Sequence, residues 1–287
     1  TGTGDPCGAA LTSHPLVDRI SFTGGLNAAQ QIIRNSAENF AEVSLELGGK
    51  SPMVIFDDVD IENAVNGILL SIFSATGQSC VAGSRLLIQD SMYDQLIEKV
   101  AARAAQIRIG DPLDDNSQMG PLATLGQLER IEETVANAIE NGATLVHGGK
   151  VPDHTDKGWY YEPTIVSCPS QDLRIVREEM FGPVVSALKF SDEEEAVALA
   201  NDSRFGLAAG VFTRDIGRAL RVTKAIRAGI VWVNTYRVVS PMAPFGGFKD
   251  SGHGRESGLD AIYDYTRAKT VWLNTSPDPI DDPFRMQ

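Results

Sequence analysis

Short runs of β-branched and aromatic residues alternate with helical patterns along this chain, and this alternation limits the fold more than any other feature. A strand is predicted at residues 19–22, a helix at residues 27–40 and a second strand at residues 43–47. Strands and helices that alternate in this way build a largely parallel sheet with helices on its faces. The sequence therefore predicts an α/β fold.

The same alternation continues through the rest of the chain. Asp60 is expected to cap a helix whose apolar residues recur at helical spacing between Ile61 and Ile72. The run Ser191-Asp-Glu-Glu194 is expected to form a capping box before a helix that ends near Ala200. Further strands are predicted at residues 53–56, 85–89, 211–212 and 230–233, and further helices at residues 93–107, 125–141 and 216–227.

The charge balance argues against a partner that is a nucleic acid or an anionic membrane. The chain has 25 basic and 38 acidic residues and a net charge of −13, whereas phosphate-rich surfaces require a basic stripe. Its longest apolar stretch, residues 68–74, is too short to span a bilayer. The chain begins at Thr1 without a methionine, and we expect it to be part of a longer protein.

The three cysteines, Cys7, Cys80 and Cys168, are far apart and contain no CxxC pair, so neither a disulfide framework nor a structural zinc site is expected. The four histidines also lack metal-ligand spacing. An odd number of cysteines suits a reducing compartment, and residues 1–10 lack the features of a signal peptide. We therefore expect a cytoplasmic protein that holds no metal.

Cys80 is the candidate nucleophile. It lies in the run Gly-Gln-Ser-Cys-Val-Ala-Gly-Ser-Arg, between Gly77 and a predicted strand. An isolated cysteine is more often a buried structural thiol, but small polar neighbours are poor surroundings for a core thiol. Because a free thiol is mostly protonated at neutral pH, Cys80 needs a base or an electropositive pocket.

Glu46 is the candidate base. It lies in the run Leu-Glu-Leu-Gly-Gly-Lys at the end of a predicted strand. Partial desolvation between two leucines would raise the pKa of this carboxyl towards neutrality, which suits general-base catalysis. The alternative is a glutamate that faces water at a strand edge. The glycine pair favours the first interpretation, because it permits close approach of a ligand to the backbone.

Gly24 and Gly25 end a predicted strand just before a helix, where phosphate commonly binds. The run is not a GxGxxG fingerprint, and an ordinary strand-to-helix turn explains it equally well. The later glycine-rich run from Gly252 to Gly258 does not follow a strand, and we interpret it as a structural turn.

Taken together, five segments resemble the aldehyde dehydrogenase superfamily, and they occur in that family's order. The runs around Glu46 and Cys80 resemble its glutamate and cysteine motifs, and Glu179-Met-Phe-Gly-Pro-Val is similar to its cofactor-contacting segment. Trp232-Val-Asn and residues 244–252 complete the series. The resemblance covers the chain from Thr1 to about residue 274.

The resemblance implies an NAD(P)-dependent enzyme that oxidises an aldehyde to a carboxylic acid. Cys80 would add to the aldehyde carbon to give a thiohemiacetal, and hydride transfer to NAD or NADP would leave a thioester. Glu46 would then activate the water that hydrolyses this thioester. Glu179 would bind the nicotinamide ribose and Phe181 would lie against the ring side. The remaining implied cofactor-binding residues are Gly24 and Gly25, at the pyrophosphate, together with Leu47 and Gly48.

The resemblance also implies how the chain is organised. Residues 1–48 would form part of a Rossmann-like dinucleotide-binding domain, residues 49–262 an α/β catalytic domain, and residues 263–287 an oligomerisation strand and tail. The strand is predicted at residues 268–274, where it has no neighbouring partner strand, so we expect a homodimer or homotetramer.

Two departures from the family pattern affect cofactor binding. The front of the pattern, with an oxyanion-binding Asn and the residues that hold the adenosine ribose, is expected to be missing from this chain. Gly25 stands where the family often has Ser, and Ala29 stands where it often has Gly. NAD and NADP therefore both remain open as cofactors.

Three alternatives compete with hydrolytic aldehyde oxidation. A CoA-acylating family member need not keep the base, so Glu46 favours hydrolysis. A cysteine esterase would use the same thiol without a cofactor, which leaves Glu179 and Phe181 unexplained. A structural protein that reuses the fold would not need Cys80 and Glu46. The identity of the aldehyde stays open.

Overall fold

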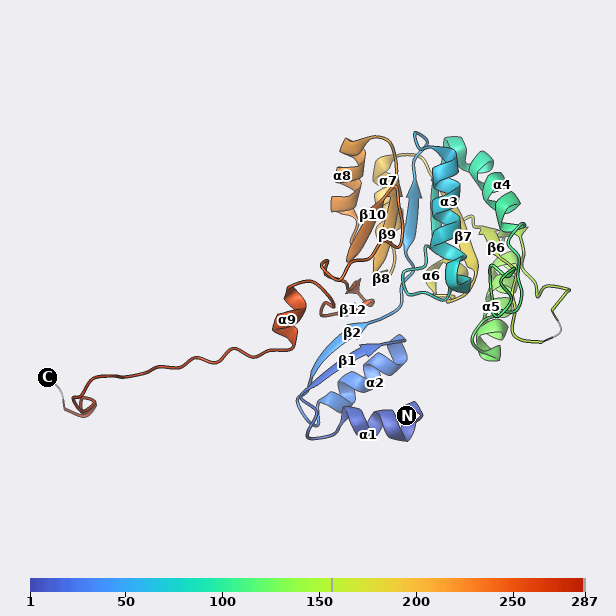
Figure 1. Cartoon of the computed structure of the whole chain (residues 1–287). Coiled ribbons are helices and arrows are strands. Elements are labelled where there is room, and N and C mark those ends of the chain that lie inside the picture. The colour runs from blue at the N-terminus through green and yellow to red at the C-terminus, as the bar shows by residue number, and fades with distance from the viewer. Residues whose placement is uncertain (156, 286–287) are drawn as a thin grey trace.

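The computed structural model describes residues 1–155 and 157–285, and it contains a small and a large β-sheet together with a two-stranded sheet between β8 (Phe205–Gly206) and β11 (Phe248–Lys249) (Figure 1). The small sheet has the order β1-β2-β12, in which β1 (Arg19–Thr23) and β2 (Glu42–Glu46) are parallel and β12 (Gly252–His253) is antiparallel. Next to it lie α1 (Ala9–Thr12) and α2 (Leu26–Ser36), which form the lower part of Figure 1 together with η1 (Gly4–Gly8).

The large sheet has seven strands in the order β10-β9-β3-β4-β7-β6-β5. All neighbours in it are parallel except β5 and β6. The strands are β3 (Pro52–Ile55), β4 (Arg85–Gln89), β5 (Thr144–His147), β6 (Thr164–Ser167), β7 (Val184–Phe190), β9 (Ala208–Phe212) and β10 (Ile230–Val233). The predicted α/β fold is confirmed.

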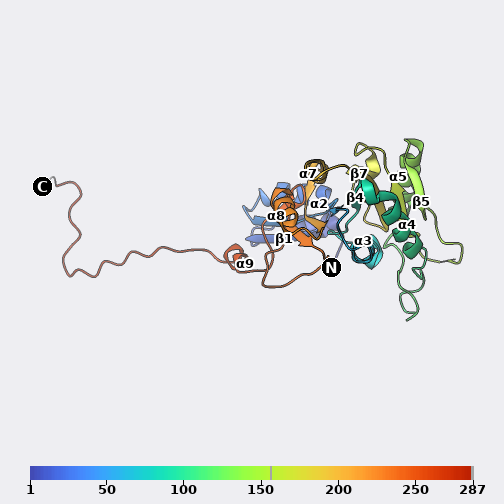
Figure 2. The same cartoon turned by 90° about the horizontal axis from the view of Figure 1, so that it is seen from above.

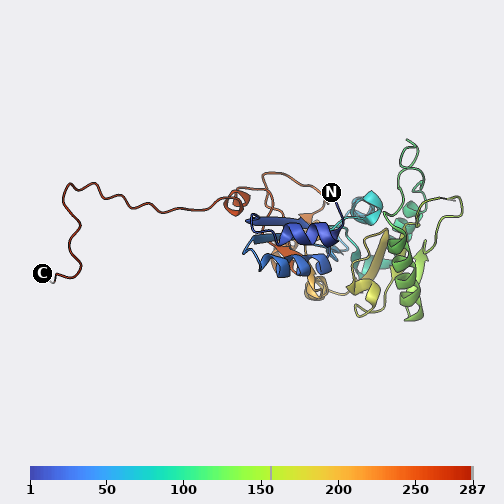
Figure 3. The ribbon, with the colours of Figure 1, turned by 90° about the horizontal axis from the view of Figure 1, so that it is seen from below.

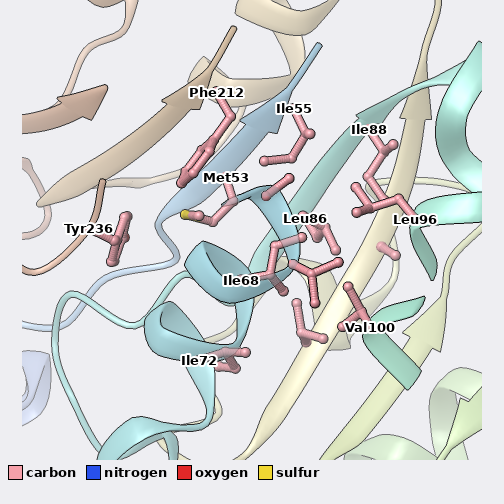
Figure 4. Close-up of a cluster of buried hydrophobic side chains, with 14 of the residues drawn as sticks. Met53, Ile55, Ile68, Ile72, Leu86, Ile88, Leu96, Val100, Phe212 and Tyr236 are labelled. Atoms are coloured by element: carbon pink, nitrogen blue, oxygen red, sulfur yellow. The ribbon is translucent and has the colours of Figure 1, made fainter. Parts of the chain in front are cut away.

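Helices cover both faces of the large sheet because each central strand is apolar on both sides. Ile55 packs in one buried cluster with α3 (Ile61–Ile72) and α4 (Tyr93–Ala104), and part of this cluster is drawn in Figure 4. Val54 packs in a second cluster on the opposite face. The helices there are α5 (Leu125–Glu140), α6 (Arg174–Arg177), α7 (Glu193–Asn201) and α8 (Ile216–Ala225); Figure 2 shows α3 and α7 on opposite sides of the sheet.

The predicted helix starts are mostly confirmed, with one shift of register. Asp60 caps α3 by accepting from the Asn63 backbone N–H at 3.0 Å. The capping box before α7 lies one residue later than predicted, because Asp192 accepts from the Glu195 N–H while Glu195 accepts from the Ser191 N–H. The physical reason is that the Asp192 backbone, and not that of Ser191, immediately precedes the first helical residue.

Several predicted helix ends were too late. The helix predicted at residues 27–40 ends at Ser36, and Phe40 has a left-handed φ of +56° that no α-helix accommodates. The helices predicted to end at residues 107, 141 and 227 end at Ala104, Glu140 and Ala225. Apolar periodicity locates a helix well but marks its last turn poorly.

Residues 205–256 connect the two sheets. β8 (Phe205–Gly206) pairs with β11 (Phe248–Lys249), and the chain then enters β12, where Gly252 lies opposite Glu46 of β2. The segment from Gly252 to Gly258, predicted as a structural turn, therefore begins by extending the small sheet. No helix of the described residues is long and apolar enough to cross a membrane.

The chain after α9 (Asp260–Asp264) extends away from both sheets (Figures 1 and 3). Residues 268–274, predicted as a strand that pairs with another copy of the chain, form no ladder within this chain. Val271, Trp272 and Leu273 are 75%, 93% and 82% exposed. A strand requires a partner for its hydrogen bonds, and this segment lies beside none.

Candidate active site

One cavity of about 530 Å³ collects every residue that the sequence predicted for catalysis or cofactor binding. These residues come from the ends of β1 and β2, from the loop before β4 and from the segment after α6. The predicted residues are Gly24, Gly25, Glu46, Leu47, Gly48, Cys80, Glu179 and Phe181, and Thr23, Gln78, Ser79 and Gln127 complete the lining.

Cys80 follows a constrained turn between α3 and β4. The turn is η2 (Ser74–Gly77), in which Ala75 and Thr76 have left-handed φ angles of +52° and +56°. Gly77 is left-handed too, and a Cβ on it would lie 2.1 Å from a carbonyl oxygen of the neighbouring loop. Left-handed backbone at non-glycine residues costs energy and persists only where the surroundings hold it. The position of Cys80 is therefore fixed by packing around its loop.

The Cys80 thiol is partly buried. Burial and the negative charge of Glu179 raise its pKa, and Glu46 adds to this effect. The backbone N–H groups of Val81 and Cys80 act in the opposite direction, since they stabilise a negative sulfur. Together these effects disfavour the thiolate.

Glu46 can act as a base towards water in the same cavity. It is the last residue of β2, opposite Thr23 of β1 and Gly252 of β12. Its side chain is 5% exposed, and neither carboxylate oxygen has a hydrogen-bond partner among the described residues. Burial and repulsion from Glu256 raise its pKa to about 7, although Arg255 partly offsets them. A carboxyl with this pKa can exchange protons at neutral pH.

The Glu179 carboxylate packs against the backbone of the glycine pair. The Gly49 N–H donates to Glu179 Oε1 at 3.2 Å. A Cβ on Gly48 would lie 1.9 Å from Glu179 Oε2, and a Cβ on Gly49 would lie 2.6 Å from the Cys80 carbonyl oxygen. Any side chain at these two positions would displace Glu179 or the cysteine loop, so glycine is required there.

The N-terminus of α2 opens on the same cavity and fits a phosphate group. Gly25 is the N-cap residue, and no side chain caps the helix. Uncapped N–H groups and the helix dipole attract anions at such a position. A Cβ on Gly25 would have no atom within 4 Å, which leaves room beside the helix start. Glu179 adds carboxylate oxygens that could accept hydrogen bonds from ribose hydroxyls, and the Phe181 ring is half-exposed in the same cavity. The start of α2, Glu179 and Phe181 together fit a dinucleotide.

Sequence reasoning missed two residues of α5. Gln127 lines the cavity, and its side-chain amide donates to the Met180 carbonyl oxygen. Arg130, one turn later, donates to the Glu179 carbonyl oxygen at 2.9 Å. Both residues orient the segment that carries Glu179. Nothing in the sequence distinguishes them from the polar residues of any exposed helix face.

Two residues near β12 were also missed. The Ser251 hydroxyl donates to the Gly48 carbonyl oxygen at 2.7 Å, and the Leu47 N–H donates to the Ser251 carbonyl oxygen at 3.0 Å. Glu256 acts electrostatically on Glu46. The segment that resembled the last family motif contains Ser251, and this was the only signal for either residue.

The other two cysteines and the histidines are absent from this cavity. Cys7 is exposed and Cys168 is buried elsewhere, and all three thiols are free. Within residues 1–155 and 157–285, no three His, Cys, Asp or Glu side chains gather as a metal site. The cavity therefore combines one thiol, one carboxyl with a pKa of about 7 and a helix start that no side chain caps.

Comparison with protein families agrees with this arrangement. Residues 1–271 match the model of the aldehyde dehydrogenase family. The chain is 54% identical to (Z)-2-((N-methylformamido)methylene)-5-hydroxybutyrolactone dehydrogenase of Acinetobacter baylyi, over 100% of this chain and 59% of that protein. It is 45% identical to betaine aldehyde dehydrogenase of Brucella anthropi, over 99% of this chain and 58% of that protein. The chain thus spans a little under three fifths of the length of these relatives.

Solved structures give the same result. A betaine aldehyde dehydrogenase from Staphylococcus aureus in complex with NAD⁺ has a TM-score of 0.94 and 41% identity, over 97% of this chain and 56% of that chain. A putative aldehyde dehydrogenase from Burkholderia cenocepacia has a TM-score of 0.95 and 41% identity, over 99% of this chain and 58% of that chain. The chain belongs to the aldehyde dehydrogenase family.

Proposed function

We propose that the protein containing this chain oxidises an aldehyde to a carboxylic acid with NAD⁺ or NADP⁺, with Cys80 as nucleophile and Glu46 as general base. The observation that carries this proposal is the single cavity shared by Cys80, Glu46, Glu179 and the start of α2. A thiol and a base can form and hydrolyse an acyl thioester, whereas a helix start and a carboxylate can bind the phosphates and ribose of a dinucleotide.

The first chemical step uses Cys80. After the thiol proton has passed to water, the Cys80 thiolate adds to the aldehyde carbon and the carbonyl bond opens to give a thiohemiacetal oxyanion. This oxyanion accepts from preorganised backbone N–H groups such as those that already stabilise a negative Cys80 sulfur. A dinucleotide bound in the cavity would supply the acceptor for the hydride on this carbon. Loss of that hydride leaves an acyl thioester on Cys80.

The second step uses Glu46. Water attacks the thioester carbonyl while the Glu46 carboxylate removes a proton, and the Cys80–acyl bond breaks to release the acid. The pKa of about 7 lets Glu46 accept this proton at neutral pH and pass it on to solvent. Glu179, held by the Gly49 N–H at 3.2 Å, is oriented to accept from the ribose hydroxyls.

NAD⁺ is the better supported cofactor. Betaine aldehyde dehydrogenase from Staphylococcus aureus was solved with NAD⁺, and its fold superimposes on this chain with a TM-score of 0.94. Of the alternatives, CoA acylation leaves the buried base Glu46 without a role, and esterase chemistry leaves Glu179 and Phe181 in the cavity without one.

We further propose the division of the chain into a partial dinucleotide-binding domain at residues 1–48, a catalytic domain at residues 49–262 and an assembly segment at residues 263–287. The first boundary is supported by the change from the small sheet, which contains β1 and β2, to the large sheet, which begins with β3. The exposed apolar side chains of residues 271–273 support homo-oligomer assembly. Three free thiols suit the cytoplasm, which we propose as the compartment.

To test this proposal, the whole protein that contains this chain is incubated with NAD⁺ and a simple aldehyde such as butanal. The amounts of reduced dinucleotide and of carboxylic acid that form are then measured together. Equal amounts of the two products without added CoA are expected. Acyl-CoA formation would instead favour the CoA-acylating alternative. Ester cleavage without any aldehyde oxidation would favour the esterase alternative.

A further inference from the structure

Arg237 lies beside the loop that presents Cys80, although it belongs to the segment after β10. Its Nη2 donates to the Ser71 and Ser74 carbonyl oxygens at 3.3 and 3.4 Å, at the end of α3 and the start of η2. The preceding residue, Tyr236, donates its hydroxyl to the Val81 carbonyl oxygen at 2.8 Å. Residues 236 and 237 therefore contact the cysteine loop on both sides of Cys80 in the sequence.

The Arg237 guanidinium has spare hydrogen-bonding capacity. It is half-buried, it forms no ion pair with the described residues, and its Nε is buried without a partner there. Burial lowers the pKa of Arg237, and the charge of a Cys80 thiolate would oppose this shift. An arginine has five donors in a planar fork, and only Nη2 makes hydrogen bonds here.

The backbone at Arg237 is strained as well. Its φ is +60°, in the left-handed region that non-glycine residues rarely adopt. Tyr236 is anchored in the core beside Met53 (Figure 4), so the strain at the next residue is imposed by a fixed neighbour. Strained backbone next to a reactive group is a common sign of a functional position.

Arg237 reaches the loop from outside the dinucleotide cavity. It is not among the residues that line this cavity, whereas Gln78, Ser79 and Cys80 are. The guanidinium nevertheless lies close enough to Cys80 for the charge of a thiolate there to act on it. A carboxylate matches the fork of arginine and satisfies several of its donors at once.

We propose that Arg237 is a specificity-determining residue that binds a carboxylate on the aldehyde substrate, so that the preferred substrates are aldehydes of oxo acids. This inference rests on the proposed function and specifies its substrate class. The competing explanation is that Arg237 only caps the end of α3, where cations are favourable. The two hydrogen bonds to α3 and η2 are long for a capping arginine, and they leave most of its donors unused.

The test compares three aldehydes that differ in charge: succinic semialdehyde, which is anionic; butanal, which is neutral and has the same carbon chain; and betaine aldehyde, which is cationic. The wild-type whole protein is expected to show the highest kcat/KM with succinic semialdehyde. In Arg237→Met, the ratio of kcat/KM for succinic semialdehyde to that for butanal should fall about 10- to 100-fold, as expected for loss of a charge-assisted hydrogen bond. Arg237→Lys should restore part of the ratio.

Arg214→Met is the matched control, because this exposed arginine forms its ion pair with Asp60 at the N-terminal end of α3, whereas Arg237 contacts the C-terminal end. Its kcat/KM ratio should equal that of the wild type. An equal loss for all three aldehydes in Arg237→Met would show a capping role and overturn the inference. Wild-type oxidation of butanal without any preference for succinic semialdehyde would also overturn it while leaving the proposed function intact. Failure to oxidise any aldehyde would instead contradict the proposed function.

Discussion

Gly49 donates its backbone N–H to Glu179 Oε1 at 3.2 Å, across 130 residues of sequence. The contact joins the glycine pair after β2 to the segment after α6, and it places a carboxylate over a backbone that carries no side chain. At Gly48, beside it, even a methyl group would come within 1.9 Å of Glu179 Oε2. The orientation of Glu179 thus depends on the absence of two side chains.

Gly48→Ala should therefore weaken dinucleotide binding. The added methyl group would push the Glu179 side chain aside, and because this side chain is flexible the protein should still fold. We expect the Kd for NAD⁺ to rise about 10-fold, the scale of one charge-assisted hydrogen bond. Titration calorimetry measures it. Gly8→Ala is the control, since the only contact of its Cβ is 3.9 Å away. Unchanged NAD⁺ affinity in Gly48→Ala would contradict the role of this contact.

Cys80→Ser should reduce aldehyde oxidation by at least about 1,000-fold, because a hydroxyl is a far weaker nucleophile than a thiol near neutral pH. The folded content and NAD⁺ affinity should not change. Cys7→Ser and Cys168→Ser should retain the wild-type rate, since neither residue lines the cavity. Steady-state absorbance of the reduced dinucleotide provides the measurement. Wild-type turnover in Cys80→Ser would exclude the proposed mechanism.

Glu46→Gln should separate acylation from hydrolysis. A rapid burst of reduced dinucleotide is expected, followed by steady turnover that is about 10²- to 10⁴-fold slower, because a positioned base contributes that much. Stopped-flow absorbance resolves the two phases. If the burst were lost while hydrolysis stayed normal, Glu46 would act in acylation and not in hydrolysis, which would contradict the proposed role.

The pH dependence of hydrolysis should follow the ionisation of Glu46. Only the carboxylate accepts a proton, so the hydrolysis rate should rise as the pH increases through about 7 and level off above it. Glu256→Gln removes a negative charge that raises this pKa, so the midpoint should move to lower pH. Glu140→Gln, an exposed residue at the end of α5, should leave the midpoint in place. A midpoint that stays constant in Glu256→Gln would contradict the electrostatic coupling.

Gly25→Ser should strengthen dinucleotide binding. The position has a φ of −90° and open space around a Cβ, so serine fits without strain. Its hydroxyl can donate to a phosphate at the start of α2, which should lower the Kd for NAD⁺ about 3- to 10-fold. Gly4→Ser, also in open space but outside the cavity, is the control. A weaker or equal affinity in Gly25→Ser would argue against a phosphate at this helix start.

Removal of the residues after Arg267 should disrupt assembly of the whole protein. Val271, Trp272 and Leu273 are exposed in the isolated chain, and pairing with another copy would bury them. Light scattering should report a smaller mass or aggregation for the truncated protein. If the truncated and intact proteins had the same oligomeric mass, residues 268–274 would not be the assembly segment.

The sequence by itself determined the features that depend on neighbouring residues. Alternating strand and helix patterns predicted the α/β fold, and Asp60 was identified as a cap because capping involves residues within one turn. Glu46 and Cys80 stood out because their short runs pair a reactive side chain with glycines or small residues. Where local signals compete, as between Ser191 and Asp192 before α7, the predicted register was off by one.

The tertiary structure decided what depends on residues far apart in the chain. The order of strands brought Glu46, Cys80 and Glu179 to one cavity, and packing imposed the left-handed backbone at Ala75. The pKa of Glu46 rises to about 7 because the fold buries it and sets Glu256 nearby, which no local pattern encodes. Residues 268–274 also show that local sequence is not sufficient. Their β-propensity is local, but a strand forms only where a partner backbone completes its hydrogen bonds.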